Sequence, residues 1–391
     1  MSVRLVAAQL NLLGCPASAH DAWDVGFKTA GEFGNAEIST SSYAAVRDTL
    51  GAVLEAKECS PGYAAARAAV HAKEAGGALV PVVTGFLGAD DQGRVQTLGR
   101  GGSDLTAAFI GAAMGFDEIQ VWKDVDGMLT ADPRVVSTAV PVESVTFDEA
   151  SELAYFGAKI LHPISMQPAM KYNIPVRIKN SYNPSHPGTW ISHAGAEGRA
   201  DSKLVTAITT KKGQMLVDVV STRMLGQYGF LATVFSIFER HQVSVDVVAT
   251  SEVSVSLTLG AERRDSVDKV VRDLSARRPN TGGKDSSDQA LDSNDPIAQV
   301  RVQEGRSILS LIANVKRSSD VMAQVFEILA KEEIQVEMLS QGASKVNISL
   351  VLRDEDLDHA LQVLHAHFFK DQVASAGPFV APPEKDLSHR Q

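Results

Sequence analysis

The stretch Thr-Leu-Gly-Arg-Gly-Gly-Ser-Asp at residues 97–104 decides the predicted fold. It follows an apolar run at 79–83 and a polar excursion typical of a hairpin, and it precedes small residues at helical spacing at 105–114. The glycines therefore fall where a strand turns into a helix, and they allow the backbone to approach a ligand closely. Ser103 and Asp104 stand where a helix cap is expected.

This stretch has the chemistry of an anion site. The amides at a helix start attract negative charge, and the Arg100 guanidinium is a planar fork suited to a carboxylate or a phosphate. The pattern predicts a seat for an acidic substrate or a nucleotide. A capped turn in an ordinary α/β domain is the alternative for the stretch taken alone. A P-loop is excluded, because no lysine followed by Ser or Thr closes the glycine run.

Length and composition predict a soluble protein of two or three domains. The chain has 391 residues, of which 44% are hydrophobic and 21% charged. The net charge of −10 argues against binding to nucleic acid or to an anionic membrane. No apolar run approaches the roughly 20 residues that span a bilayer. Cys15 and Cys59 lack metal-ligand spacing and are interpreted as reduced thiols, and no metal site is predicted.

In the first half of the chain, segments with the two-residue period of strands are interleaved with segments that have the 3.6-residue period of helices. This order predicts an α/β domain with a mainly parallel sheet. Helices are expected at 2–13, 43–57, 62–75, 105–114 and 144–161, and strands at 79–84, 118–122 and 174–180, the last of this domain. A polar, glycine-rich linker is expected at 193–203.

The strand at 118–122 runs directly into Lys123 and Asp124. Ligands of open α/β sheets collect at the carboxyl ends of strands, so these two side chains are candidates for contact with one. A solvated Asp-Gly turn is the alternative. His162, which ends the helix predicted at 144–161, is interpreted as structural.

The second half contains an internal repeat. Residues 234–248 are echoed by 325–339, and strand patterns at 253–259 and 346–352 close the two copies. Each copy predicts the order strand, helix, strand, strand, helix, which is that of a ferredoxin-like module. Residues 277–296, rich in Asp, Ser, Asn and Gly, are predicted to be a flexible insert between the copies.

These motifs together resemble the aspartate kinase family, over nearly the whole chain. The resemblance is carried by residues 84–86, 97–104, 122–127, 147–163 and the duplicated module. It implies an amino-acid-kinase (carbamate-kinase-like) sandwich domain followed by two ferredoxin-like ACT domains. The implied domains are 1–195 for the kinase, 204–276 and 297–370 for the ACT pair, and 371–391 for a tail. Residues 174–184 and 224–231 look most like the plant and algal plastid members, which implies the chloroplast stroma, with the cytoplasm as the alternative.

The family transfers the γ-phosphoryl group of ATP, with Mg²⁺, to the side-chain carboxylate of L-aspartate, giving 4-phospho-L-aspartate for lysine, threonine and methionine biosynthesis. By resemblance, Arg100 clamps a carboxylate of aspartate and Asp104 orients a catalytic lysine of the family. The other substrate residues are Gly101, Gly102 and Ser103, and the nucleotide residues are Lys123, Asp124, Arg134 and, as a further candidate, Lys179.

The chain departs from the family pattern in one respect. Family members begin with a strand that bears Lys-Phe-Gly-Gly, and this sequence occurs nowhere in residues 1–391. A substrate-binding glutamate of the family would precede Met1. Loss of a cation at the transition state commonly costs several kcal/mol, at ~1.4 kcal/mol per tenfold in rate, so weak activity is expected of this stretch alone. An unpaired sheet edge and exposed apolar surface are expected as well.

The ACT pair implies regulation by an amino acid, usually lysine or threonine in this family, and a homodimer. Asp246 could pair with the ammonium group of lysine, while main-chain groups near Gly229 hold its carboxylate. The residues that match the lysine-binding pattern are Met224, Gly229, Phe230, Leu231, Val245, Asp246, Thr250, Ser251 and Glu252. For Phe230 and Leu231, core packing is an equal alternative. Residues 341–347 form the matching turn of the second copy, which is assigned to the dimer interface.

Two functions follow from the resemblance. The first is a lysine-inhibited aspartate kinase. The second is a catalytically weak or inactive subunit that keeps the ACT pair to sense an amino acid. A glutamate or uridylate kinase fits residues 122–127 and 147–163 and the ACT pair less well.

Overall fold

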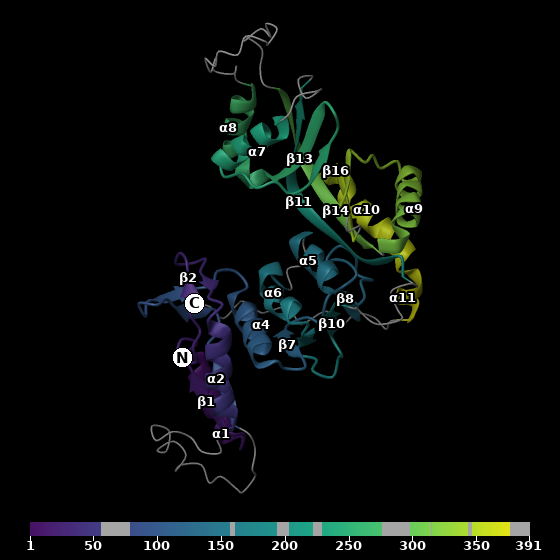
Figure 1. The fold of residues 1–391 in the computed structure, drawn as a ribbon. Helices are drawn as coiled ribbons and strands as arrows, with labels where there is room; N and C mark the ends of the chain where they lie inside the picture. Colours follow the sequence, from purple (N-terminus) through teal and green to yellow (C-terminus); the bar gives the residue numbers. More distant parts are fainter. Residues whose placement is uncertain are drawn as a thin grey trace, which may run out of the picture. The chain divides into compact units, whose positions relative to one another are not determined.

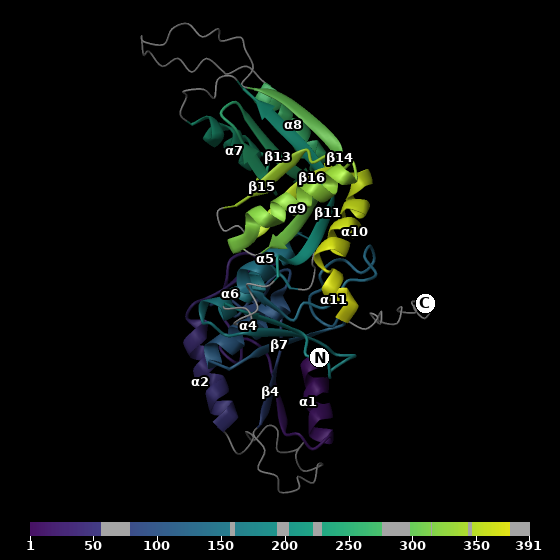
Figure 2. The ribbon, with the colours of Figure 1, turned by 90° about the vertical axis from the view of Figure 1, so that its right-hand side faces the viewer.

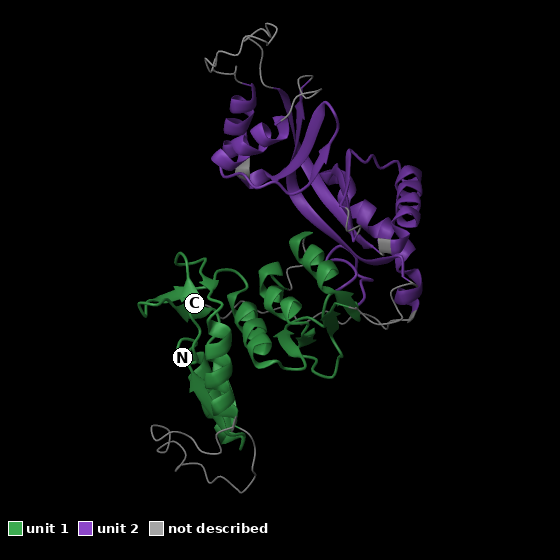
Figure 3. Ribbon diagram, in the orientation of Figure 1, with its two compact units in different colours: residues 1–128, 141–198, 381–391 green, residues 129–140, 199–380 purple. Residues whose placement is uncertain are grey.

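The computed structural model describes residues 1–55, 79–156, 161–193, 203–221, 229–275, 298–313, 315–342 and 346–375. They divide into two compact units, each with its own core (Figure 3). The first unit comprises described residues of 1–128 and 141–198, and the second those of 129–140 and 199–380. The predicted insert at 277–296 and the helix predicted at 62–75 lie outside the described residues.

The first unit begins with helix α1 (Ser2–Leu12), followed by strand β1 (Ala17–His20), which pairs in parallel with β4 (Val80–Val83) (Figure 1). Helix α2 (Ser42–Glu55) lies between these two strands in the sequence. The helices predicted at 2–13 and 43–57 and the strand predicted at 79–84 are therefore confirmed to within two residues at each end.

The stretch at 97–104 joins a hairpin to a helix, as predicted. Strands β5 (Leu87–Ala89) and β6 (Val95–Thr97) pair antiparallel, and α4 (Gly102–Met114) follows. A second short ribbon is formed by β2 (Thr29–Ala30) and β3 (Glu37–Ile38). Phe27 and Phe109 pack edge to face at 5.0 Å between ring centroids within the core under α4. This core fixes the start of α4 in place.

The remaining strands of the first unit form a four-stranded sheet in the order β7-β9-β10-β8. They are β7 (Ile119–Lys123), β8 (Ser144–Thr146), β9 (Val176–Asn180) and β10 (Thr189–Ser192). The β7–β9 and β8–β10 pairs are parallel, and β9–β10 is antiparallel. The prediction that 174–180 is the last strand was wrong, because β10 follows it; a four-residue strand after a Pro- and Gly-rich loop gives too little periodicity to be recognised.

The prediction of a single helix at 144–161 was also wrong for its first three residues. Residues Ser144–Thr146 form β8, and helix α5 is Phe147–Phe156. Thr146 and Glu149 exchange side-chain to main-chain hydrogen bonds of 2.7 and 3.1 Å, a capping box that starts the helix after the strand. A further helix, α6 (Pro163–Lys171), begins at the N-cap residue His162, where the sequence predicted only an end.

The second unit contains the predicted repeat. Both copies show the order strand, helix, strand, strand, helix. The first copy is β11 (Val205–Val220), α7 (Phe230–Arg240), β12 (Val248–Thr250), β13 (Ser254–Gly260) and α8 (Arg264–Ser275). The second is β14 (Gln299–Ala313), α9 (Ser318–Lys331), β15 (Met338–Gln341), β16 (Asn347–Arg353) and α10 (Asp354–Phe368), followed by α11 (Lys370–Ser375).

One six-stranded sheet joins the two copies, in the order β12-β13-β11-β14-β16-β15 (Figure 2). The long strands β11 and β14 run through both halves: Gln214 to Val220 of β11 pairs with β13, and Arg306 to Ile312 of β14 pairs with β16. The two edge strands meet, since Ser340 Oγ donates to the carbonyl of Val248 at 3.1 Å. Two apolar cores, one per copy, cover the sheet.

The predicted domain boundaries stay predictions, but the division into units contains a feature that they lack. Residues Leu129–Val140 belong to the second unit, although the sequence on either side of them belongs to the first. Among the described residues, none of the helices is both long and apolar enough to cross a bilayer.

Candidate active site

The anion site is predicted at the N-terminus of α4. Its N-cap residue is Gly101, with φ 75° and ψ 7°, and no side chain caps the helix. Ser103 and Asp104 therefore stand in the first turn of the helix and not at the cap, which corrects the predicted capping role. The amide of Gly102 donates to the carbonyl of Gly99 at 3.2 Å. Because no side chain caps the helix, the amides of Ser103 and Asp104 in its first turn are candidates for contact with an anion.

Two glycines are required by their surroundings. Gly101 has a left-handed backbone, and a Cβ atom there would lie 2.6 Å from Cβ of His162, the N-cap of α6. A Cβ atom on Gly102 would lie 2.8 Å from the Phe86 ring. The starts of α4 and α6 thus meet at Gly101. Two positive helix ends in one place strengthen an anion site, and the helical role of His162 could not be recognised from the sequence.

Arg100 and Ser103 are exposed at this helix start. Arg100 makes no ion pair with any residue that the structure describes, so its guanidinium is free to bind a ligand carboxylate or phosphate. The role predicted for Arg100 stays a prediction.

Asp104, in the first turn of α4, binds the side chain of Lys123. The Lys123 ammonium lies 2.9 and 3.1 Å from the two carboxylate oxygens of Asp104, and both side chains are partly buried. Lys123 ends β7 and Asp104 lies in the first turn of α4, so the pair connects the sheet to the helix start. The sequence predicted both residues for the site but not their contact. A lysine is thereby fixed beside the anion site.

The loop after β7 is held by the loop after β9. The carbonyl of Lys123 accepts hydrogen bonds from the amide and the hydroxyl of Ser181, both at 2.9 Å. The carboxylate of Asp126 accepts from the side-chain amides of Asn180 at 2.8 Å and Asn183 at 3.2 Å. Asp124 is exposed on this ordered loop, where the prediction placed a nucleotide contact.

Lys179 is not brought to Lys123. Lys179 pairs in register with Trp122, one residue before Lys123, and neighbouring side chains of a strand point to opposite faces of the sheet. The ammonium of Lys179 lies 5.1 Å from the centre of the Trp122 ring and donates to the carbonyl of Pro184 at 2.9 Å. The prediction that Lys179 binds the nucleotide stays a prediction, with this geometry against it.

Arg134 belongs to the segment that packs in the second unit. Its guanidinium binds Asp132 through two nitrogens, at 2.6 and 3.0 Å, while 88% of the side chain is exposed. The hydrogen bonds from Arg134 lower the pKa of the Asp132 carboxyl group. The predicted nucleotide role of Arg134 stays a prediction.

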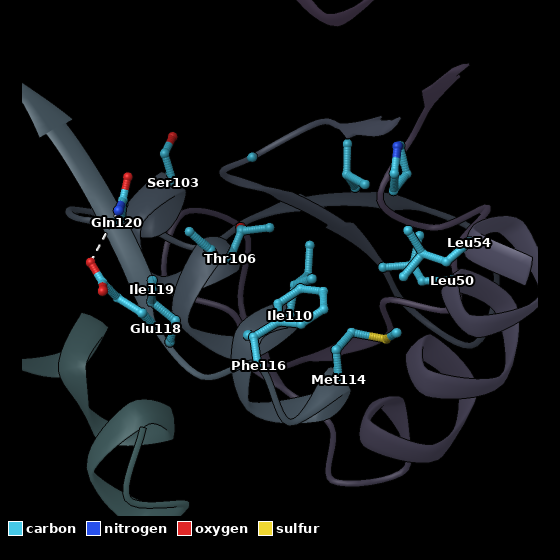
Figure 4. A pocket seen from close by; sticks show the side chains of 15 residues that line it. Leu50, Leu54, Ser103, Thr106, Ile110, Met114, Phe116, Glu118, Ile119 and Gln120 are labelled. Carbon is cyan, nitrogen blue, oxygen red and sulfur yellow. Dashed lines mark hydrogen bonds between the residues drawn. The ribbon is translucent and has the colours of Figure 1, made fainter. Parts of the chain in front are cut away.

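An apolar cavity of about 420 Å³ lies in the first unit beside α4 (Figure 4). Its lining includes residues of β4 and β7, namely Pro81, Val83 and Ile119, and residues of α4 and α2 such as Ile110 and Leu50. Each of β4 and β7 has one edge without a paired strand among the described residues. Unpaired edges and apolar surface were expected of this sheet.

In the second unit, the predicted effector residues lie at the start of α7 and around β12. Gly229 is the N-cap of α7, with φ 83° and no capping side chain, so the first-turn amides can hold a carboxylate. Phe230 and Val245 pack against the core of the first copy, whereas Leu231 is 40% exposed. Core packing therefore accounts for Phe230 but not for Leu231. Met224 lies outside the described residues.

Asp246 is ion-paired within the chain. The Lys211 ammonium lies 2.6 Å from its carboxylate, which is largely buried. The equivalent acid of the second copy, Glu337, pairs with Arg306 in the same way. Each copy thus neutralises this acid with a cation from a long central strand, a feature that the sequence did not reveal. An effector ammonium at Asp246 would have to share the carboxylate with Lys211.

The other effector candidates, Thr250, Ser251 and Glu252, are exposed on the turn between β12 and β13. The hydroxyl of Ser251 accepts from the amide of Ser254 at 3.1 Å, which shapes that turn. Within the described ranges, no group of three or more His, Cys, Asp or Glu side chains could hold a metal ion.

Comparison with known proteins agrees with this geometry. Residues 1–180 match the model of the amino acid kinase family, and residues 310–368 match an ACT domain model. A crystal structure of E. coli aspartokinase III in complex with aspartate and ADP has 33% sequence identity and a TM-score of 0.66, over 94% of this chain and 73% of that one. The chain belongs to the aspartokinase family.

A second structure of the family, E. coli aspartokinase III in complex with lysine and aspartate, gives a TM-score of 0.67 at 32% identity, over the same shares of the two chains. Aspartokinase 3, chloroplastic, from Arabidopsis thaliana is 47% identical over 377 residues, which is 96% of this chain and 61% of that protein. The chain therefore spans less than two thirds of the length of this relative. The expected α/β fold with a kinase and an ACT part is confirmed.

Proposed function

We propose that the chain carries the aspartate kinase reaction, in which the side-chain carboxylate of L-aspartate is phosphorylated by ATP to give 4-phospho-L-aspartate and ADP. One observation carries the proposal: the exposed Arg100 fork stands just before the uncapped start of α4, and Asp104 in the first turn of that helix binds the Lys123 ammonium. This arrangement fits two anionic reactants in one place.

The carboxylate acceptor is bound by Arg100. A guanidinium can donate two parallel hydrogen bonds to a carboxylate, which fixes its orientation as well as its charge. The amides at the start of α4, with the Ser103 hydroxyl, supply further donors. A carboxylate oxygen of aspartate then attacks the γ-phosphorus of ATP, and the bond to the β,γ-bridging oxygen breaks to release ADP.

Lys123 offsets the charge of the phosphates. Phosphoryl transfer depends on positioning and electrostatic stabilisation, because the protein supplies little covalent help. The Asp104 carboxylate holds the ammonium at 2.9 Å. Mg²⁺ bound with ATP would supply further positive charge at the phosphates. We assign Asp124, which is exposed directly after Lys123, to the nucleotide.

The relatives support this substrate pair. Aspartokinase III of E. coli has been solved with aspartate and ADP, and separately with lysine and aspartate. We extend these ligands to this chain: aspartate and ATP for the first unit, and lysine for the ACT pair at Gly229, Asp246 and their neighbours. Inhibition by lysine, a homodimer formed through the ACT domains, and a place at the start of lysine, threonine and methionine biosynthesis belong to the same proposal.

A plastid location is proposed on the likeness to the chloroplastic aspartokinase of Arabidopsis. The alternative of a catalytically weak amino-acid sensor is not favoured by the relatives, which are named as aspartokinases.

The test is release of ADP, measured with a coupled assay in the presence of ATP, Mg²⁺ and aspartate. Two chains are compared: residues 1–391, and the same residues preceded by a strand bearing Lys-Phe-Gly-Gly. Aspartate-dependent release by the extended chain, suppressed by lysine, supports the proposal. ATP turnover that ignores aspartate, or no turnover and no binding of aspartate by calorimetry in either chain, overturns it.

A further inference from the structure

The segment Leu129–Val140 leaves the first unit and packs in the core of the second. Ala131, Val136 and Ala139 are at most 5% exposed, and they lie in the core cluster of the second ACT copy. The segment is also held by its main chain, because the amide of Ile208 in β11 donates to the carbonyl of Thr130 at 2.8 Å. Gln362 of α10 donates to the carbonyl of Val135 at 3.2 Å.

Thr130 is the polar centre of this attachment. Its side chain is 1% exposed, and its hydroxyl oxygen accepts from the amide of Val140 at 3.0 Å. The other contact of the hydroxyl is Nε2 of His365, at 2.9 Å. One side chain thereby joins the two ends of the segment to helix α10.

His365 is an unfavourable residue to bury unless it has a role. It is fully buried and stacks on Phe369 at 4.6 Å between ring centres. Its Nδ1 atom has no hydrogen-bond partner among the residues that the structure describes. Burial lowers the pKa of His365 to about 4, so the ring is neutral near pH 7. A leucine would fill this core position without an unsatisfied polar atom, so the energetic cost of the imidazole must be offset by its bond to Thr130.

The ends of the segment are tied directly to the site loop. Met128, the residue before it, is fully buried in the first unit, where its amide donates to the Thr189 hydroxyl at 2.8 Å. The carbonyl of Met128 accepts from the amide of Val142, just beyond the other end, at 2.8 Å. From Met128 the chain runs back without interruption to Asp124 and to Lys123, which binds Asp104.

We infer that Thr130 and His365 are positioning residues. Their hydrogen bond anchors residues 129–140 in the second unit, called the ACT unit from here on, and these residues directly follow the nucleotide loop at 124–128. The inference rests on the proposed function for the role of that loop. The ACT unit holds this segment by peptide bonds and a buried core, so a change in its packing reaches Lys123 and Asp124 through the chain itself. The anchor assigns a physical route to regulation by the ACT domains.

The test uses variants of the whole chain that remove only the bond. Thr130→Val and His365→Leu delete the hydroxyl and the imidazole at similar side-chain volume, while Thr130→Ser and His365→Gln keep a hydrogen-bonding group. Ser310→Ala is the matched control, because the Ser310–Ser349 hydrogen bond of 2.8 Å is also buried in the second unit and joins β14 to β16. Amide hydrogen exchange at Met128 and Val142 is the first readout, and KM for ATP is the second.

Removal of the anchor is expected to speed exchange at Met128 and Val142 by about tenfold over Ser310→Ala, compared at equal distance below Tm. KM for ATP should rise more than KM for aspartate, and the two conservative variants should behave as the wild type. Equal exchange in Thr130→Val, His365→Leu and Ser310→Ala overturns the anchor. The exchange readout needs no turnover, so an inactive wild type would overturn the proposed function alone.

Discussion

The first unit, called the kinase unit here, and the second, the ACT unit, have differently organised sheets. In the ACT unit, β11 and β14 run through both halves of one six-stranded sheet, and the edge strands β12 and β15 meet at Ser340 and Val248. In the kinase unit, the strands form separate smaller sheets, and β4 and β7, which line an apolar cavity, each have one edge without a paired strand in the part of the chain that the structure describes. In the ACT unit, Lys211 and Arg306 form ion pairs with acidic side chains of the same unit. In the kinase unit, Arg100 is exposed.

From this difference we expect one unit to contribute mainly to stability and the other mainly to ligand binding. The ACT unit has two apolar cores, and its acids Asp246 and Glu337 are both ion-paired within the chain. We therefore expect substitutions there to act first on folding and on the proposed response to an amino acid. In the kinase unit, the proposed site lies at one helix start, where we expect the exposed Arg100 to contribute little to folding and much to binding. Substitutions in the two units should therefore differ in kind.

The largest effect is expected from Arg100→Met in the kinase unit. Loss of the fork should lower kcat/KM for aspartate by roughly 10²–10³-fold, as for removal of a transition-state donor, while Tm stays constant because the side chain is exposed. Coupled ADP release on the extended chain measures it. Arg94→Met, which removes an exposed guanidinium paired with Asp90, is the control. Equal losses in both variants would remove Arg100 from the site.

The second effect belongs to the ACT core. Leu361 of α10 is fully buried, so Leu361→Ala should lower the free energy of unfolding by about 2–5 kcal/mol in urea titrations. The exposed Leu231→Ala should change it by less than about 0.5 kcal/mol. Binding of ADP to the folded chain should persist in Leu361→Ala. Loss of ADP binding at temperatures where that variant is folded would contradict the separation of the two units.

The third effect is a pH dependence of stability. The folded pKa of His365, about 4, lies below the unfolded value of 6.5, so the unfolded chain binds the extra proton. His365 therefore lowers stability as pH falls from 6.5 towards 4, by up to about 1.4 kcal/mol per pH unit, and has no such effect above 6.5. Urea unfolding across this range should show a shallower pH slope in His365→Leu than in the wild type. Parallel slopes would show that the ring is not buried neutral.

The next effect compares the two ACT copies. Asp246→Asn should weaken lysine binding about tenfold, since the effector ammonium loses its carboxylate, whereas Glu337→Gln in the second copy should leave it close to the wild-type value. Calorimetric titration with lysine measures both. Equal weakening in the two variants would assign the effector to both copies, and no change in either would remove Asp246 from the site.

The smallest effect is expected at Lys179. Its ammonium is engaged by the Trp122 ring and the Pro184 carbonyl on the other face of the sheet from Lys123. Lys179→Met should change KM for ATP by less than about threefold, the range of an exposed cation at a ring. A tenfold or larger rise would restore Lys179 to the nucleotide site.

The sequence predicted most where structure is local. The repeat in the ACT unit was recognised because each copy combines period-two strands with amphipathic helices, and the glycine stretch gave the anion site because Gly101 must turn at a helix start. Ser103 and Asp104 were predicted at the helix cap but lie in the first turn, because a helix can begin at a glycine without any capping side chain.

The rest depended on contacts between distant residues. Nothing in the sequence around Thr130 indicates that it meets His365, because the two belong to different predicted domains and the segment has no regular periodicity. The Lys123–Asp104 and Lys211–Asp246 pairs were likewise invisible, since pairing of charges is set by the fold and not by spacing. β10 was missed because it is too short to show alternation.

The most direct test of the account traps the product of the proposed reaction. The extended chain is incubated with ATP, Mg²⁺ and aspartate in the presence of hydroxylamine, which converts an acyl phosphate into a hydroxamate, over a range of lysine concentrations. The account predicts a hydroxamate that requires aspartate and falls as lysine rises. ADP release without hydroxamate, or hydroxamate formation that lysine does not change, would contradict a kinase unit controlled by its ACT unit.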